Sequence, residues 1–316
     1  MSTILITGAA GFIGSHLSER LLARADRVAG LDCFNDYYDP AIKRANLTAS
    51  HSHPEFSLHE TDICHREALF EVFRTVRPDV VVHLAARAGV RPSLLDPQLY
   101  HEVNVKGSQN LLDACREYPV QNLVFASSSS VYGGSDRVPF REDDPVHGPV
   151  SMYAATKRMN ELQAHVHSHL YGLNVSMMRF FTVYGPRQRP DMAINKFTRM
   201  IAAGQPIPMF GDGTTRRDYT YIDDIVDGLV RTIDRPRPYE VYNLGESDTT
   251  ELRELIQLLG ELLGVEPVID HQPLQPGDVP LTYADISKAR ELLGYDPQVP
   301  IREGLRRYVE WFKAQG

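Results

Sequence analysis

Two residues of the sequence have the types and the spacing of an acid–base pair. Tyr153 and Lys157, in "YAATK", are four residues apart in a segment with a helical pattern, so they share one face of the expected helix. An ammonium group near a phenol stabilises the phenolate, which lowers the pKa of the tyrosine and makes it a usable base near neutral pH. An exposed tyrosine–lysine contact is a common pair on helix surfaces and shows the same spacing, so the pair taken alone favours that interpretation.

Four consecutive serines, Ser127–Ser130, follow a short run, Asn122–Phe125, that reads as a buried strand. A run of serines is usually a flexible linker or a loop rich in turns. The position of this run therefore raises the question of why a core strand should end in four hydroxyl groups.

A glycine-rich turn lies near the N-terminus. In "ITGAAGFIGSHL", Gly8, Gly11 and Gly14 stand between the first expected strand and the first expected helix. Glycines let the backbone turn tightly and approach a pyrophosphate, which sits on the helix N-terminus. Eighteen residues after Gly14, Asp32 ends the second expected strand, where a carboxylate would bind a ribose 2′-hydroxyl and repel a 2′-phosphate. The pattern favours NAD over NADP, although a tight turn formed for packing, followed by an exposed aspartate, would show the same sequence pattern.

The elements that must position these residues alternate along the first half of the chain. We expect strands over 4–7, 28–31, 80–84, 122–125 and 175–181, and helices over 12–25, 100–118 and 153–171. This order predicts an α/β fold with a parallel, doubly wound sheet. After residue 184 Pro and Gly become frequent, and shorter helices are expected near 250–263, 286–293 and 302–314. We therefore expect a cofactor-binding domain over 1–178, with a strand near 241–244 returning to its sheet, and a smaller, mainly substrate-binding domain over 179–316.

The composition argues against several classes of function. The 316 residues carry a formal net charge of −8, which disfavours a general nucleic-acid-binding surface, and no apolar run approaches the length of a membrane span. Three widely spaced cysteines suggest neither a disulfide framework nor a zinc knuckle. His165, His167 and His169 alternate on one expected helix without a second group of ligands, so no metal is expected. With no basic region before the first apolar stretch, the N-terminus does not read as a secretory signal, and we expect a cytoplasmic protein.

Taken together, the glycine turn, the serine-rich strand end and YxxxK resemble the extended short-chain dehydrogenase/reductase family. The resemblance covers essentially the whole chain and includes "HLAA" at 83–86, "SSSVYG" at 128–133, "RFFTVYGP" at 179–186, "RRDYTYIDD" at 216–224 and "PGD" at 276–278. Within the family the sequence is most similar to nucleotide-sugar 4-epimerases, especially those acting on UDP-glucuronate. The resemblance implies a Rossmann fold, a bound NAD, a UDP-sugar substrate and a homodimer formed through helices near 100–118 and 153–171. The implied reaction oxidises C4, turns the 4-keto sugar in the pocket and returns the hydride to the opposite face.

The resemblance also assigns roles to residues. It implies that Tyr153 is the base, that Ser128 binds the sugar 4-hydroxyl beside it and that Lys157 completes the catalytic set. The implied cofactor-binding residues are Gly8, Gly11, Phe12, Ile13, Gly14, Asp32, Asn35, Asp62, Ile63, Leu84, Ala85, Ala86, Asn104, Tyr153 and Lys157. The implied substrate-binding residues are Arg91, Ser129, Ser130, Thr182, Arg189, Arg217, Gln275 and Asp278. Thr182 and Arg189 match positions near the sugar carboxylate, and a carboxylate that leaves water needs such donors.

Several residues bear on neighbouring reactions. Related 4,6-dehydratases carry Thr-Asp-Glu where this chain has Ser128–Ser130, and neutral hydroxyls cannot replace the two acids well. Glucuronate decarboxylases typically have an Ala-Ser-Pro-type segment where this chain reads "AARAGVRPS". Gln275 replaces an arginine of the galactose-type epimerases, which favours the glucuronate type, whereas Arg87 and Arg187 depart from that type's pattern. The alternatives are an epimerase of UDP-glucose or UDP-N-acetylglucosamine, a decarboxylase or net oxidoreductase, and a nucleotide sensor without turnover.

Overall fold

A seven-stranded parallel sheet forms the centre of the computed structural model, which describes residues 2–273 and 279–315. The strand order is β11-β6-β5-β4-β1-β2-β3, and every neighbouring pair is parallel. The strands are β1 (Thr3–Thr7), β2 (Arg27–Asp32), β3 (Phe56–Glu60), β4 (Val80–His83), β5 (Asn122–Ser128), β6 (Val175–Phe180) and β11 (Tyr239–Leu244). The predicted parallel, doubly wound sheet is confirmed. The strand order reverses between β1 and β4, where ligands bind in sheets of this type.

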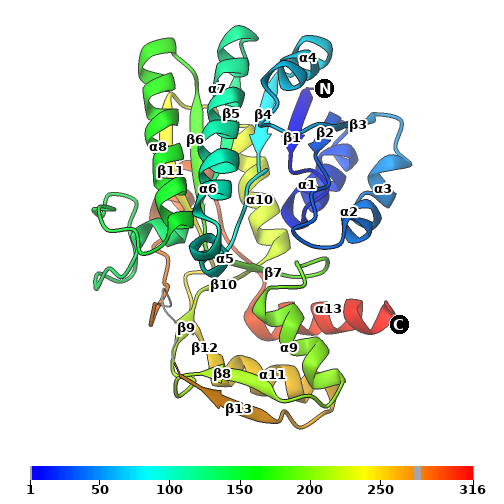
Figure 1. The fold of residues 1–316 in the computed structure, drawn as a ribbon, viewed down its shortest axis with the longest axis vertical. Helices are drawn as coiled ribbons and strands as arrows, with labels where there is room; N and C mark the ends of the chain where they lie inside the picture. Colours follow the sequence, from blue (N-terminus) through cyan, green and yellow to red (C-terminus); the bar gives the residue numbers. More distant parts are fainter. Residues whose placement is uncertain (1, 274–278, 316) are drawn as a thin grey trace.

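Helices cover both faces of this sheet (Figure 1). One layer contains α4 (Arg66–Val76), α7 (Ser108–Glu117) and α8 (Met152–Tyr171), and the other contains α1 (Phe12–Ala23) and α10 (Ile222–Ile233). Successive strand residues point to opposite layers, so the core has two main clusters: Leu5 belongs to one, whereas Ile4 and Ile6 belong to the other. Met177 and Met178 are both fully buried, one in each cluster. Burial on both faces explains the continuous apolar runs in the central strands, such as Ile4–Ile6 in β1 and Val80–Val82 in β4.

The segment expected as one helix over 100–118 consists of three pieces. They are α6 (Pro97–Tyr100), a π-helix η1 (His101–Gly107) and α7. A hydrophobic pattern cannot distinguish a π-helical turn from an α-helical one, because both keep an apolar face toward the sheet. The π-helical segment contains Asn104, which is fully buried and hydrogen-bonds to the loop after β4.

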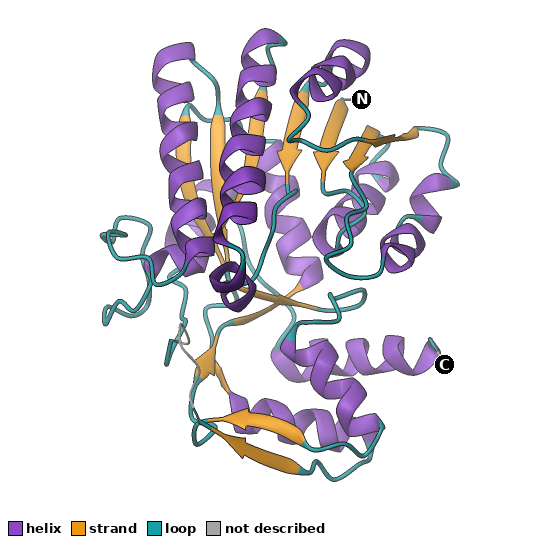
Figure 2. Cartoon of the chain, viewed as in Figure 1, coloured by secondary structure: helices purple, strands orange, loops and turns teal. Residues whose placement is uncertain are grey.

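The C-terminal part lies beyond the carboxyl ends of the sheet strands, below them in Figures 1 and 2. Its strands form three two-stranded sheets: β7 (Thr182–Tyr184) with β10 (Tyr219–Tyr221), β9 (Arg216–Arg217) with β12 (Thr250–Glu251), and β8 (Ile207–Phe210) with β13 (Ile269–Gln272). Its helices are α9 (Ala193–Ala202), α11 (Leu252–Leu263), α12 (Ser287–Leu293) and α13 (Ile301–Ala314). The shorter elements near the sheet edge are α2 (Pro40–Asn46), α3 (Thr48–His51), α5 (Val90–Leu95) and η2 (Ser129–Tyr132). Among the described residues, no helix has both the length and the apolar character needed to cross a membrane.

Candidate active site

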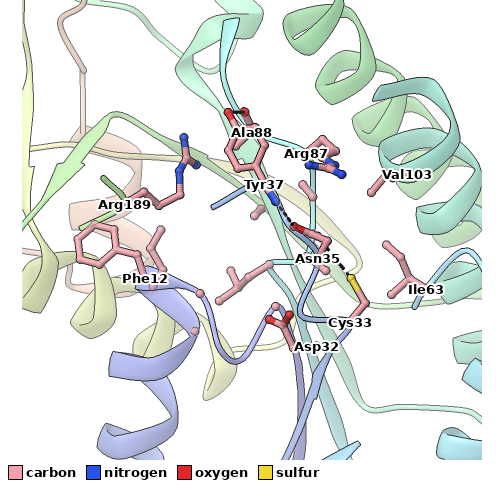
Figure 3. A pocket seen from close by; sticks show the side chains of 18 of the residues that line it. Phe12, Asp32, Cys33, Asn35, Tyr37, Ile63, Arg87, Ala88, Val103 and Arg189 are labelled. Carbon is pink, nitrogen blue, oxygen red and sulfur yellow. Dashed lines mark hydrogen bonds between the residues drawn. The ribbon is translucent and has the colours of Figure 1, made fainter. Parts of the chain in front are cut away.

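A pocket opens at the carboxyl ends of β1, β2, β4 and β5, and Figure 3 shows part of its lining. It brings together all three predicted catalytic residues, Ser128, Tyr153 and Lys157. It also contains the predicted cofactor residues Gly8, Gly11, Phe12, Ile13, Gly14, Asp32, Asn35, Asp62, Ile63, Leu84, Ala85 and Ala86. Residues far apart in the sequence thus converge on one cavity.

Asn104 is the one predicted cofactor residue that does not line this pocket. Its Oδ1 accepts a hydrogen bond from the Arg87 backbone N–H at 2.8 Å, and its Nδ2 donates to the Arg87 carbonyl at 2.9 Å. The same Nδ2 donates to the Thr156 hydroxyl at 3.1 Å. Asn104 therefore holds the backbone of the pocket wall against α8.

The glycine turn forms a cradle that a side chain would fill. Gly8 has a φ of +71°, and a Cβ added there would lie 2.8 Å from the Ala85 backbone nitrogen. A Cβ on Gly14 would lie 2.2 Å from the Gly8 carbonyl oxygen. Gly11, the N-cap of α1, makes no side-chain capping bond. The first turn of α1 is thus open to an anion such as a pyrophosphate, which fits a dinucleotide.

Asp32 lies at the end of β2 in the same pocket and is 7% exposed. Its carboxylate accepts hydrogen bonds from the backbone N–H groups of Ala10 at 3.1 Å and Phe34 at 2.9 Å. Burial raises the pKa of Asp32, and the N–H of Phe34 and the charge of Lys43 oppose this rise. The Lys43 ammonium donates to the Asn35 carbonyl and side-chain oxygens at 2.8 and 2.9 Å, so it orders the loop after β2.

Tyr153 and Lys157 extend from α8 toward the end of β5. The Ser128 side chain interacts with the Tyr153 phenol and lowers its pKa. The Lys157 ammonium donates to the Ala126 carbonyl at 2.8 Å and lies 6.0 Å from the centre of the Tyr153 ring. The helix and the strand end therefore present a hydroxyl, a phenol and an ammonium group to one side of the pocket.

The expected lowering of the Tyr153 pKa is not found in this protein. Burial raises the pKa of Tyr153, and the interaction with Ser128 and the charge of Arg189 offset only part of that rise. Burial also lowers the pKa of Lys157 to about 8, against the charge of Glu161. The spacing of Tyr153 and Lys157 in the sequence reveals the nearby ammonium but not the enclosure of both groups, which disfavours the charged form of each.

The four serines turn out to have different neighbours. Ser127 lines the pocket, and its hydroxyl donates to the buried Glu161 carboxylate at 2.7 Å. Ser128 faces the Tyr153 phenol and also accepts a hydrogen bond from the Ser130 backbone N–H at 3.1 Å, which caps η2. Ser129 and Ser130 are half-buried in η2 and are not among the residues that line the pocket. The serine run thus attaches a strand end to a helix, supplies one hydroxyl to the pocket and turns the chain.

Glu161 receives donors from three elements. Arg179 of β6 binds it through Nε and Nη2 at 2.8 and 2.9 Å, and Arg158 donates at 2.8 Å. Neither Arg179 nor Glu161 is more than 2% exposed. Burial alone would raise the pKa of Glu161, but the hydrogen bonds and charge of Arg179 lower it, so the carboxylate is ionised. This pair lies one helical turn beyond Lys157 and fixes α8 to β5 and β6.

Two tyrosines that the sequence argument missed shape the pocket. The hydroxyl groups of Tyr37 and Tyr100 both donate to the Ala88 carbonyl, at 2.7 and 2.8 Å. The Tyr37 ring lies 5.4 Å from the guanidinium carbon of Arg87 and 5.4 Å from that of Arg189 (Figure 3). Nothing local in "CFNDYYD" indicates these contacts, which depend on loops that meet only in the folded chain.

A second pocket lies beside the first in the C-terminal part. Its lining includes two predicted substrate residues, Arg91 and Arg217, and also Asp191, Ala193, Lys196, Phe197, Pro208, Phe210, Thr215, Tyr219 and Leu252. The Arg91 guanidinium carbon lies 4.6 Å from the centre of the Phe210 ring. Cationic and aromatic side chains in one cavity suit an anion joined to a planar base.

The remaining predicted substrate residues are placed as follows. Arg189 lines the first pocket, whereas Thr182 lies in β7 opposite Tyr219 of β10 and is not among the residues lining either pocket. Gln275 and Asp278 lie outside the described residues. His165 and His169 are stacked with ring centres 6.5 Å apart, and within the described chain no group of three or more His, Cys, Asp or Glu residues could hold a metal ion.

Comparisons with known proteins agree with this geometry. Residues 4–245 match the NAD dependent epimerase/dehydratase family. A UDP-glucuronate 4-epimerase from Thermodesulfobacterium geofontis is 43% identical over 99% of this chain and 97% of its own. The crystal structure of a UDP-glucuronic acid 4-epimerase from Bacillus cereus, in complex with UDP-glucuronic acid and NAD, is 36% identical with a TM-score of 0.93, covering 99% of this chain and 100% of that one. A UDP-glucose 4-epimerase structure from Thermotoga maritima, with UDP-glucose, is 33% identical with a TM-score of 0.91 and 99% coverage of both chains.

The Arg179–Glu161 pair should be essential for stability. Glu161→Gln leaves a buried guanidinium without its counter-charge, and we expect a loss of about 3–5 kcal/mol in the free energy of unfolding. Urea denaturation measures this loss. Glu71→Gln is the matched control, because it breaks an Arg74 pair in which both side chains are about 60% exposed, and it should cost at most about 1 kcal/mol. Equal losses for the two variants would contradict a structural role for the buried pair.

Proposed function

The chain belongs to the NAD dependent epimerase/dehydratase family, and we propose that it is a UDP-glucuronate 4-epimerase that interconverts UDP-glucuronate and UDP-galacturonate. The observation that carries the substrate assignment is that Arg189 lines the same pocket as Ser128, Tyr153 and Lys157. A guanidinium beside the acid–base residues can pair with a carboxylate on the carbon next to C4. The alternative, an epimerase of neutral UDP-sugars, has the same catalytic residues, but its sugar would bring no carboxylate to this arginine.

We assign the cofactor to the first pocket. The cradle at Gly8, Gly11 and Gly14 would hold the pyrophosphate of NAD on the N-terminus of α1, and Asp32 would bind the adenosine ribose. NAD, when bound there, supplies the acceptor and later the donor of the C4 hydride. In this assignment residues 1–178 with β11 form the cofactor domain, and the rest of 179–316 mainly covers the nucleotide-sugar.

Side chains of the protein itself carry out the acid–base steps. Tyr153 takes the proton of the sugar 4-hydroxyl, and Ser128, which lines the same pocket, orients that hydroxyl. Because burial raises the pKa of Tyr153, its phenolate needs positive charge nearby. Lys157 and Arg189 line the same pocket and can supply this charge. The same phenol returns the proton when C4 is reduced again, so the reaction needs no net acid or base.

The carboxylate needs a restraint during this cycle. Oxidation at C4 gives a β-keto acid, because the carboxylate is attached to C5 beside the new ketone. Such an acid loses carbon dioxide when the bond from C5 to the carboxylate aligns with the carbonyl π system. Hydrogen bonds from Arg189 would hold the carboxylate away from that alignment, and we retain Thr182 as a second donor. The epimerase thereby avoids decarboxylation.

The second pocket suits the UDP part of the substrate. Arg91 and Arg217 would bind the diphosphate, with Lys196 nearby, and the aromatic residues would contact the uracil ring. We retain two further groups of predicted contacts: Ser129 and Ser130 with the sugar, and Gln275 and Asp278 with the nucleotide.

We also propose that the protein is a homodimer. Met159, Leu162, Val166 and Leu170 recur along one face of α8 and are 40–60% exposed, and Leu95 of α5 is 88% exposed. A row of exposed apolar side chains on a helix is typical of an interface. The free cysteines, of which Cys33 is exposed, fit the reducing cytoplasm that we propose as its compartment.

Incubation with UDP-sugars tests the reaction. We expect the protein to equilibrate UDP-glucuronate and UDP-galacturonate, with no carbon dioxide released, as measured by chromatography and NMR. A preference for UDP-glucose or UDP-N-acetylglucosamine would contradict the carboxylate assignment.

Replacing the phenol tests its role as the base. Tyr153→Phe should keep NAD bound but lower turnover by two or more orders of magnitude, about the size expected for a lost general base. Near-normal turnover in Tyr153→Phe would contradict the role of the phenol.

Cofactor choice tests the role of Asp32. In calorimetric titrations of protein stripped of dinucleotide, NAD should bind much more tightly than NADP, since a 2′-phosphate would face the carboxylate. Asp32→Asn should narrow this difference mainly by improving NADP binding. Equal affinities of the unchanged protein for the two dinucleotides would remove Asp32 from the ribose site.

A charge introduced into the apolar face of α8 tests the dimer. Leu162→Glu combined with Val166→Glu should convert a particle of twice 35.6 kDa into one of 35.6 kDa in sedimentation velocity. Arg20→Glu, on the exposed side of α1, is the control and should leave the mass unchanged. A monomer before any substitution, or a dimer after it, would contradict this interface.

A further inference from the structure

Arg189 is paired with a carboxylate of its own chain. Its Nε donates to Asp191 Oδ1 at 3.0 Å and its Nη2 to Asp191 Oδ2 at 2.8 Å, so the two planar groups meet edge to edge. The Arg189 side chain is 20% exposed and that of Asp191 is 44% exposed. A guanidinium that could pair with a sugar carboxylate therefore already has a counter-ion.

The segment that carries this pair is held on both sides. Arg187 is not among the residues lining either pocket and binds Glu19 of α1 through Nη1 and Nη2 at 2.6 and 3.0 Å. The buried Gln188 donates to the Val183 carbonyl at 3.0 Å and accepts from the Asn195 backbone N–H at 3.1 Å. Arg187 thus has a structural role, and Arg189 is the arginine of this segment that lines the first pocket.

The pair lies where the two pockets meet. Arg189 lines the first pocket, whereas Asp191 lines the second, together with the cationic Arg91, Lys196 and Arg217. Tyr37 packs its ring near the Arg189 guanidinium carbon, at 5.4 Å, and Figure 3 shows both side chains in the pocket. Arg189 is thereby held between an aromatic ring and a carboxylate.

We propose that Asp191 is a specificity-determining residue that acts as the resident counter-ion of Arg189 and so weakens the preference for a uronate over a neutral hexose. This inference rests on the proposed function, in which Arg189 binds the sugar carboxylate. When a neutral sugar is bound, Arg189 keeps its partner, and no unpaired cation is enclosed. When a uronate is bound, its carboxylate must share the guanidinium with Asp191 and is repelled by it.

The charges of the pair support this account. Burial would raise the pKa of Asp191, but the hydrogen bond and charge of Arg189 lower it, so the aspartate is ionised at neutral pH. Replacing Asp191 by asparagine leaves the guanidinium without a counter-charge in the protein. A uronate then supplies the missing charge and a hexose does not, so discrimination between them increases. A change in diphosphate affinity affects both UDP-sugars equally and cancels in their ratio.

Binding measured without turnover tests the inference. In NAD-loaded protein carrying Tyr153→Phe, calorimetry gives the dissociation constants of UDP-glucuronate and UDP-glucose. We expect Asp191→Asn to raise the ratio of the UDP-glucose constant to the UDP-glucuronate constant by about tenfold, the size of one charge-assisted contact. Asp191→Glu keeps a carboxylate and should leave the ratio within about threefold of its starting value. Asp136→Asn, at an exposed position outside both pocket linings, is the control for the change of net charge and should leave the ratio unaltered.

The outcomes separate this inference from the function on which it rests. An unchanged or lower ratio in Asp191→Asn overturns the inference, because Asp191 would then be irrelevant or would orient Arg189 for the uronate. Arg189→Gln should lower the ratio at least tenfold if the arginine binds the carboxylate at all. If Arg189→Gln leaves the ratio unchanged, both uronate recognition by Arg189 and the inference are contradicted. If Arg189→Gln lowers the ratio as expected but Asp191→Asn leaves it unchanged, only the inference is contradicted.

Discussion

The buried ion pair between Arg179 of β6 and Glu161 of α8 fixes the geometry on which the site depends. Taking two charges out of water is expensive, and their attraction repays the cost only when the remaining hydrogen-bonding positions are filled. Here the carboxylate also accepts hydrogen bonds from Ser127 of β5 and from Arg158 of its own helix. Arg179 in turn donates a hydrogen bond to the Tyr132 hydroxyl at 2.9 Å. The pair therefore fixes the position of α8 along its axis relative to the sheet. Because Tyr153 and Lys157 lie in the two preceding turns of the same helix, their position relative to Ser128 follows from it.

Local patterns in the sequence identified those pocket residues that lie close together in the chain. The glycine turn and Asp32 are parts of one β-α-β unit, and the spacing of Tyr153 and Lys157 is one helical turn, so local patterns predict both. The parallel sheet follows from alternating strands and helices, and fourteen of the predicted fifteen cofactor residues line one pocket. The exception is Asn104. Its buried amide binds the backbone of a loop that precedes it by seventeen residues, a contact no local pattern contains.

Features built from separate loops could not be predicted in the same way. Tyr37 follows β2, Ala88 follows β4 and Arg189 follows β7, and they meet only because the strand ends lie at one edge of the sheet. The second pocket likewise combines Arg91 with residues more than one hundred positions later. The sign of the Tyr153 pKa shift was mispredicted for a related reason. The ammonium at position 157 was visible in the sequence, whereas the enclosure that outweighs it is a property of the whole fold.

The enclosure of Tyr153 gives the Arg189–Asp191 pair a second consequence. The charge of Arg189 lowers the pKa of the Tyr153 phenol against the effect of burial, so this guanidinium acts on the base as well as on the proposed sugar carboxylate. A sugar carboxylate that paired with Arg189 would bring a negative charge near the phenol and oppose this effect of the guanidinium. Asp191 is already bonded to Arg189, so its negative charge acts against the guanidinium before any substrate is bound. The protonation of the base and the proposed recognition of the sugar therefore depend on the same guanidinium.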